Sequence, residues 1–313
     1  MARPTLLMTG AYPQWDLDYF EDNYEVLRLW EAADRNAFLR SHGPSVQAIA
    51  TRGDLGAGAD LIAVLPNLEI ISVFGVGTDA VDLGAARARN IKVTNTPDVL
   101  TDDVADIAVA LLLAAARQVP QGDALVRSGA WAQGGLPLVT RVSGKKVGIA
   151  GMGRIGASVA KRLAAFDCEI SYYARSSKAE LPYKFEPSLL ALAQDNEFLI
   201  VTLSGGEGTK NIIDKQVLDA LGPNGILVNV SRGSTVDEIA LLDALEAKAI
   251  KSAGLDVFWN EPNINPRFFT LPNVALQPHH ASGTVETRKA MGQLVRDNLA
   301  AHFARQPLLT PVA

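Results

Sequence analysis

Short apolar runs alternate with stretches of helical periodicity along the whole chain. In the first hundred residues, the strand-like runs are 6–9, 48–51, 70–73 and 92–95, with helical stretches between them. Strands that alternate with helices line up in a parallel sheet, and the helices cover both of its faces. The pattern therefore predicts an α/β fold for this part of the chain.

A second alternating series begins at residue 146. Its predicted strands are 146–150, 169–174, 198–202, 226–229, 251–255 and 274–277. The predicted helices between them include 157–166, 215–220 and 235–249. Six parallel strands joined by crossover helices form a doubly wound, Rossmann-type sheet.

Because the second series starts so late, the first hundred residues are expected to form a separate domain. The stretch 285–304 is helical by periodicity and is expected to pack back on that domain. We therefore predict two Rossmann-like domains. The first contains residues 1–98 plus 285–313 and the second contains residues 99–284, with the ligand cleft between them.

Composition narrows the class of protein. The chain has 313 residues, of which 48% are hydrophobic, and its mean hydropathy is +0.11, which indicates a globular protein with an ample core. The net charge of −5 and the lack of a basic block argue against nucleic acid or an anionic membrane surface as a partner. The most apolar stretch, 107–116, is well short of the ~18 residues that span a bilayer.

The cysteine and histidine content bears on compartment and metal binding. Cys168 is the single cysteine, so no disulfide can form within the chain, and a reducing compartment is favoured. The N-terminal apolar run is too short for a signal peptide, which makes the cytoplasm the expected location. None of the four histidines has metal-ligand spacing with a cysteine, so we expect no metal site.

The most informative motif is Gly151-Met152-Gly153-Arg154-Ile155-Gly156, between a predicted strand and a predicted helix. In a dinucleotide-binding turn, the first glycine allows the tight turn and the second lets the backbone approach a pyrophosphate. The third allows close packing of helix and strand. The helix N-terminus then offers N–H groups to the phosphates. A structural turn alone is the less favoured interpretation.

The end of the next strand bears on the choice of cofactor. NAD sites usually place a carboxylate there to bind the ribose 2′-hydroxyl, whereas this chain has Arg175, Ser176 and Ser177. A guanidinium and two hydroxyls suit a 2′-phosphate, so we predict NADP(H). A solvated basic loop is the alternative.

Three polar segments follow the later predicted strands and contain Arg232, Glu261 and His279. Ligands of open parallel sheets bind beyond the carboxyl ends of the strands, so topology predicts that these side chains converge. Taken singly, each has an ordinary structural explanation, such as a surface charge or a turn residue. Their joint order after the strands favours catalysis.

With these segments in view, the chain resembles the D-isomer-specific 2-hydroxyacid dehydrogenases over nearly its whole length. The resemblance rests on the glycine motif, on residues 94–106, and on the Arg, Glu and His segments in the family's order. Residues 99–106 and 174–176 look like those of NADPH-preferring glyoxylate/hydroxypyruvate reductases and hydroxyphenylpyruvate reductases. The family implies a flavodoxin-like substrate domain beside the dinucleotide-binding domain.

The resemblance implies roles for three residues. Arg232 would hold the substrate carboxylate and polarise its carbonyl. His279 would give a proton to the carbonyl oxygen as hydride arrives. Glu261 would accept a hydrogen bond from the other ring nitrogen, fixing the tautomer and favouring imidazolium. If the alignment slipped by one residue, His280 would exchange roles with His279.

Further contacts are implied by position. Those to the cofactor are Thr101, Arg154, Ile155, Thr202, Ser204, Thr209, Val230, Asp256 and Ser282. Asp256 has an alternative role, the electrostatic tuning of the histidine. Those to the substrate are the backbone amides of Val76 and Gly77, in a turn suited to anions, and also Arg52.

The implied activity is the NADPH-dependent reduction of small 2-oxoacids, with glyoxylate and hydroxypyruvate first and phenylpyruvate-type acids next. The family is commonly dimeric, and the apolar helix at 104–116 together with Trp131 suits a homodimer interface. The competing class is a regulatory protein on the same scaffold that senses NAD(P)H. An intact Arg232, Glu261 and His279 set argues against it, because a sensor does not need proton transfer.

Overall fold

The computed structural model describes residues 3–312 and divides the chain into two compact units. Unit 1 contains Met1–Leu100 and Gly283–Ala313, and unit 2 contains Thr101–Ser282. The chain thus leaves unit 1 once and returns to it at its C-terminal end. The domain boundaries predicted from the sequence lie after residues 98 and 284.

Unit 1 is built on a five-stranded parallel sheet with the order β2-β1-β3-β4-β5. This is the flavodoxin-like strand order. The strands are β1 (Thr5–Met8), β2 (Glu25–Arg28), β3 (Val46–Arg52), β4 (Ile70–Phe74) and β5 (Lys92–Thr94). The buried runs of β1, β3 and β4 supply the apolar core, as expected for strands covered on both faces.

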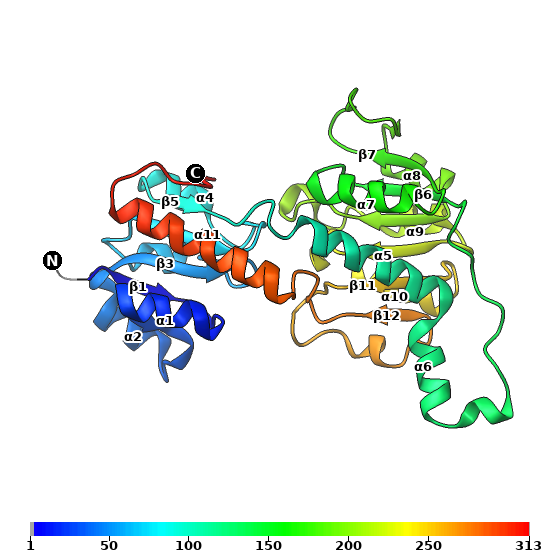
Figure 1. The fold of residues 1–313 in the computed structure, drawn as a ribbon, viewed down its shortest axis with the longest axis horizontal. Helices are drawn as coiled ribbons and strands as arrows, with labels where there is room; N and C mark the ends of the chain where they lie inside the picture. The colour runs from blue at the N-terminus through cyan, green and yellow to red at the C-terminus, as the bar shows by residue number, and fades with distance from the viewer. Residues whose placement is uncertain (1–2, 313) are drawn as a thin grey trace. The chain divides into compact units, whose positions relative to one another are not determined.

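The helices of unit 1 are α1 (Gln14–Asn23), α2 (Arg35–His42), α3 (Ala59–Ala63), α4 (Leu83–Ala88) and α11 (Val285–Phe303). Helix α11 contacts α1 and β4, so the C-terminal part of the chain completes this unit (Figure 1). Thr284 caps α11 by accepting a hydrogen bond from the Thr287 amide.

Unit 2 contains a seven-stranded parallel sheet with the order β12-β11-β10-β9-β6-β7-β8. Its strands are β6 (Lys146–Ala150), β7 (Glu169–Tyr173), β8 (Lys184–Glu186), β9 (Phe198–Val201), β10 (Ile226–Asn229), β11 (Ser252–Leu255) and β12 (Val274–Leu276). The sequence predicted six of these; β8 is the additional one. The strand order reverses between β6 and β9, and ligands of doubly wound sheets bind at such a switch point.

The helices of unit 2 are α5 (Thr101–Arg117), α6 (Val119–Arg127), α7 (Arg154–Ala164), α8 (Leu189–Asp195), α9 (Lys215–Leu221) and α10 (Glu238–Glu246). Helix α5 packs on β10, β11, β12 and α7. Its apolar side chains, including Leu111 and Leu112, are thereby buried within unit 2. The apolar side of this helix is therefore not available as the dimer interface that the sequence suggested. Within residues 3–312, none of the helices combines the length and the apolar composition that crossing a membrane requires.

Candidate active site

The glycine motif forms the turn between β6 and α7, at the switch point of the sheet. Gly151 has a φ of +103°, a conformation that side chains disfavour. A Cβ atom on Gly156 would lie 2.1 Å from the Gly151 carbonyl oxygen, so only glycine allows α7 to approach this turn so closely. Across the switch point, the Thr202 hydroxyl donates to the Gly151 carbonyl at 2.5 Å. The turn is thus fixed from both sides.

The start of α7 fits the phosphates of a dinucleotide. Gly153 precedes the helix as its N-cap residue, and within residues 3–312 no side chain caps the helix there. A Cβ on Gly153 would meet no described residue within 4 Å, so the space beside this backbone is open. First-turn N–H groups without a capping side chain form an anion site. Arg154 and Ile155 are the first two residues of the helix, as expected for the pyrophosphate turn.

The loop after β7 exposes the side chains that the sequence assigned to a 2′-phosphate, namely Arg175, Ser176 and Ser177. Tyr172, on β7, is fully buried and reaches the far end of this loop. Its hydroxyl accepts a hydrogen bond from the Lys178 amide at 2.7 Å and donates to the Lys178 carbonyl at 3.4 Å. The buried tyrosine therefore closes the loop around the three exposed side chains.

The loop after β9 contains three further predicted cofactor contacts. Ser204 is exposed, whereas the Thr209 hydroxyl donates to the carbonyls of Ser204 and Gly206 at 2.7 and 3.1 Å. With the Thr202 hydroxyl bound to the Gly151 carbonyl, two of these three hydroxyls hold the backbone. Their immediate role is to shape the loop.

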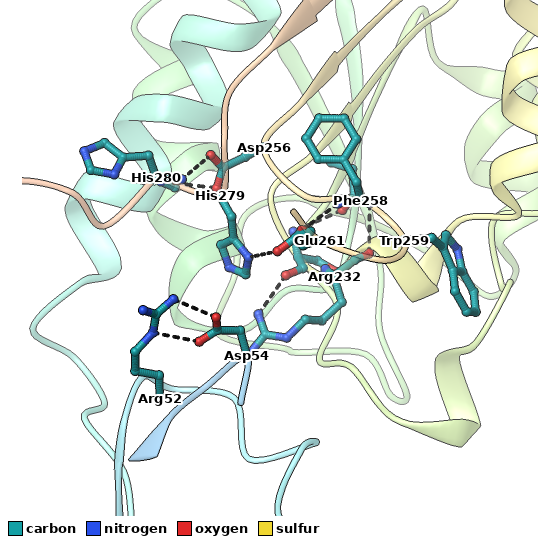
Figure 2. Close-up of polar contacts among 12 residues, drawn as sticks. Arg52, Asp54, Arg232, Asp256, Phe258, Trp259, Glu261, His279 and His280 are labelled. Carbon is teal, nitrogen blue, oxygen red and sulfur yellow. Dashed lines mark hydrogen bonds and ion pairs between the residues drawn. The ribbon is translucent and has the colours of Figure 1, made fainter. Parts of the chain in front are cut away.

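His279 and Glu261 form a close contact in unit 2 (Figure 2). The Nδ1 atom of His279 lies 2.6 Å from Glu261 Oε2, and Oε1 of the same carboxylate accepts the Phe258 amide at 2.7 Å. The histidine side chain is 35% exposed, so its ring remains accessible. A carboxylate acceptor at Nδ1 places a proton there and leaves Nε2 as the atom available to a ligand.

The backbone around His279 is held by Asp256. The His279 amide donates to the Asp256 carbonyl at 2.8 Å, and His279 has a φ of +50°, which is unusual outside glycine. The Asp256 carboxylate accepts the amides of His280 and Ala281 at 2.8 and 3.2 Å. Burial raises the pKa of Asp256, and the His280 amide opposes that shift. These contacts give Asp256 a role that the sequence did not suggest, which is to hold the backbone around His279.

Arg232 follows β10. Glu261 follows β11, which pairs with β10, and His279 follows β12, which pairs with β11. Its carbonyl accepts hydrogen bonds from Asn229 Nδ2 at 3.0 Å and from the Thr235 hydroxyl at 2.7 Å. Its guanidinium donates to the Ser231 carbonyl at 2.9 Å. The carboxyl ends of three adjacent strands therefore bring Arg232, Glu261 and His279 to one edge of the sheet, as topology predicted (Figure 2).

Unit 1 contains the predicted substrate contacts after β3 and β4. Among residues 3–312, the amides of Val76 and Gly77 donate to no protein acceptor, so both N–H groups are available to a ligand. Arg52 is different, because its guanidinium makes a two-point contact with the Asp54 carboxylate at 3.0 and 2.7 Å. This internal counter-ion balances the charge of Arg52 and weakens the case for it as an anion ligand.

Sequence reasoning did not identify three residues that support the site: Asn229, Phe258 and Tyr172. Each acts through a turn whose geometry no motif encodes. Of the remaining predicted cofactor contacts, Val230 is buried, Ser282 is half-buried, and Thr101 begins α5. The structure shows no ligand-directed geometry for these three.

Comparison with known proteins shows the family. Residues 109–281 match the model of the NAD binding domain of D-isomer specific 2-hydroxyacid dehydrogenases. The glyoxylate/hydroxypyruvate reductase A of Arabidopsis thaliana is 49% identical over 292 residues, which cover 93% of either chain. A 2-ketogluconate reductase of Gluconobacter oxydans is 52% identical over 274 residues, covering 88% of each.

A solved structure is similar over the whole length of the chain. The NADPH-dependent glyoxylate/hydroxypyruvate reductase of Sinorhizobium meliloti, in complex with NADP and malonate, is 44% identical with a TM-score of 0.94. The match covers 100% of this chain and 97% of that one. The chain therefore belongs to the D-isomer specific 2-hydroxyacid dehydrogenase family, and it is an oxidoreductase with a dinucleotide-binding domain.

Proposed function

We propose that this protein reduces small 2-oxoacids to D-2-hydroxyacids with NADPH, and that glyoxylate and hydroxypyruvate are its first substrates. The observation that carries this proposal is the 2.6 Å contact between His279 and Glu261, with Arg232 at the same edge of the sheet. A regulatory sensor does not need a histidine oriented for proton transfer. The relatives in Arabidopsis and Sinorhizobium carry the proposed activity in their names.

The reduction adds a hydride to the keto carbon and a proton to its oxygen. Bound NADPH supplies the hydride. Glu261 keeps a proton on Nδ1 of His279, so the proton that passes to the carbonyl oxygen comes from Nε2. Arg232 binds the substrate carboxylate and draws electron density from the carbonyl, which eases hydride addition. The oxygen gains one proton and the carbon one hydride, which balances the reaction.

The carboxylate of the substrate is assigned a second set of donors, the amides of Val76 and Gly77. In support of this assignment, neither amide donates to a protein acceptor within residues 3–312, and both lie in a turn at the carboxyl end of β4. Consecutive N–H groups of this kind bind anions. Arg52 stays a weaker assignment, because Asp54 already binds its guanidinium.

The preference for NADPH is assigned to the loop after β7. Arg175, Ser176 and Ser177 offer a guanidinium and two hydroxyls to the 2′-phosphate. The positively charged loop lacks the carboxylate that usually binds the ribose of NAD. The glycine turn serves the pyrophosphate, and Val230, Ser282 and Thr101 remain assigned to the cofactor by position.

Two properties of the whole protein complete the proposal. We assign it to the cytoplasm, because a lone cysteine suits a reducing compartment. We also propose that it is a homodimer. We assign the interface to the exposed segment 119–141, which includes Trp131, in place of the apolar face of α5.

The test is the oxidation of NADPH against a panel of glyoxylate, hydroxypyruvate, pyruvate, phenylpyruvate and 2-ketogluconate, repeated with NADH. We expect turnover with glyoxylate and hydroxypyruvate and a higher kcat/KM with NADPH. The highest kcat/KM with 2-ketogluconate would keep the reaction class and change the substrate to the one named for the Gluconobacter relative. Tight NADPH binding without turnover on any 2-oxoacid would favour the sensor.

A further inference from the structure

We propose that Asn95 and Thr96 are positioning residues that aim the amides of Val76 and Gly77 at the substrate carboxylate. This inference rests on the proposed function, which takes these two amides as a carboxylate site. The segment belongs to the Thr-Asn-Thr-Pro-Asp run at 94–98, which carries the family resemblance but has no role in the function derived above.

Asn95 controls the direction of the Gly77 amide. Its side-chain Nδ2 donates to the Val76 carbonyl oxygen at 2.8 Å. The carbonyl of Val76 and the N–H of Gly77 belong to one planar trans peptide group, so they point in opposite directions. When Asn95 fixes the carbonyl, the Gly77 N–H must therefore point away from Asn95.

Thr96 does the same for the preceding peptide group. Its amide donates to the Gly75 carbonyl at 2.9 Å, and its hydroxyl accepts the Gly75 amide at 3.0 Å. Thr96 is fully buried, which makes it a rigid support. With the carbonyls of Gly75 and Val76 both bound to residues 95–96, the next two N–H groups both point away from that segment. This is the parallel arrangement that an anion site needs.

Asn95 is itself anchored from the C-terminal part of the chain. The Thr310 hydroxyl donates to the Asn95 carbonyl at 2.6 Å, and the Asn95 amide donates to the Thr310 carbonyl at 3.3 Å. Asn298, on α11, donates to the Thr310 hydroxyl at 2.9 Å. Backbone contacts thus hold Asn95 in place, and its side chain binds the Val76 carbonyl.

The test compares Asn95→Leu with a matched control, Asn67→Leu. Leucine has the same four side-chain heavy atoms, branched at Cγ, as asparagine, and it cannot donate a hydrogen bond. Asn67 also donates its Nδ2 to a backbone carbonyl, that of Pro44, at the same 2.8 Å, but it lies before β4 rather than after it. The two variants therefore lose the same kind of contact within unit 1.

We expect Asn95→Leu to raise the KM for glyoxylate and the inhibition constant of oxamate about tenfold, as for one weakened hydrogen bond to a charged group. The KM for NADPH, kcat and the melting temperature should match those of Asn67→Leu. A KM for glyoxylate equal to that of the control, or a fall in kcat alone, would overturn the inference. Wild-type protein without turnover or oxamate binding would instead overturn the proposed function.

Discussion

His279 and His280 are neighbours in sequence, but their side chains have different surroundings. His279 is bound to Glu261, whereas the His280 ring is exposed and turned away from this pair (Figure 2). We predict that His279→Ala lowers kcat by about 10² to 10⁴, the contribution of a general acid, and leaves the Kd for NADPH unchanged. Steady-state kinetics and a fluorescence titration with NADPH measure these two effects.

The matched control is His280→Ala, which should reduce kcat less than twofold because its ring has no part in the Glu261 contact. If the larger loss occurred in this variant, the family alignment would be shifted by one residue. Near-normal turnover in His279→Ala would remove the histidine from the mechanism altogether.

The loop after β7 allows a second prediction at this scale. Arg175→Ala should raise the KM for NADPH far more than that for NADH, because NADH has no 2′-phosphate. Tyr172→Phe should produce a smaller effect of the same kind, since it releases the loop at Lys178 and leaves Arg175 intact. Initial rates with both cofactors provide the comparison. An equal change for NADH and NADPH in Arg175→Ala would contradict the assignment.

At the residue scale, the sequence predicts side chains better than it predicts the backbone that orients them. Arg232, Glu261 and His279 follow three successive strands, so their common edge could be deduced from topology alone. The role of Asp256 could not, because it depends on two amides beyond a turn with a left-handed residue. The ion pair of Arg52 with Asp54 likewise depends on the loop after β3.

At the element scale, buried strands were predictable and two exposed edge strands were not. The predictions at 146–150 and 226–229 coincide with β6 and β10, whose side chains are nearly all buried. The missed strands, β2 and β8, lie at sheet edges and are partly exposed, so they lack a continuous apolar run. Hydrophobic periodicity detects burial, and it fails where a strand is held mainly by its pairing.

The contact between α1 and α11 contains a buried charge. Asp16, on α1, is fully buried and forms an ion pair with Arg296 on α11, while its Oδ2 atom has no hydrogen-bond partner among the described residues. Gly292 makes room for it, because a Cβ there would lie 2.2 Å from Asp16 Oδ1. Burial raises the pKa of Asp16 to about 6, against the opposing effect of Arg296.

This shift predicts how stability depends on pH. The folded pKa of about 6 lies above the ordinary value of 3.8, so the folded protein binds this proton more tightly than the unfolded chain does. The stability contributed by Asp16 is therefore fully present below the unfolded pKa of 3.8 and is lost as the pH rises through about 6, by up to about 3 kcal/mol in total. Asp16→Asn cannot titrate and should lack this loss.

The measurement is the free energy of unfolding in urea for wild type and Asp16→Asn between pH 4.5 and 7.5. All other titrating groups are shared, so the difference between the two proteins isolates Asp16. The free energy of unfolding of Asp16→Asn relative to that of wild type should increase as the pH rises through 6 and should then stay level. A difference that is constant over the whole range would show that Asp16 ionises normally.

At the scale of the whole molecule, the segment 119–141 is a part of unit 2 whose side chains are largely exposed. Helix α6 has no buried residue, and the chain beyond it extends from the sheet before it returns to β6 (Figure 1). Its exposed apolar side chains are Val119, Val126, Trp131, Leu136 and Leu138. An apolar surface of this kind on a single chain usually marks an interface.

The dimer prediction follows from this surface, because a second copy offers the same uncovered segment in return. Light scattering should give wild-type protein a mass of twice the 33.3 kDa of one chain.

Trp131→Glu should reduce that mass to the mass of a single chain without unfolding the protein, since this tryptophan is 65% exposed and packs little within its own unit. Phe269→Glu is the matched control, because Phe269 is 70% exposed in the same unit but lies outside the segment, and it should remain dimeric. If wild-type protein had the mass of one chain, or if both variants dissociated alike, the interface would not be formed by 119–141. If Trp131→Glu alone dissociates, the exposed segment 119–141 joins the two copies. The apolar face of α5 then belongs to the core of each copy.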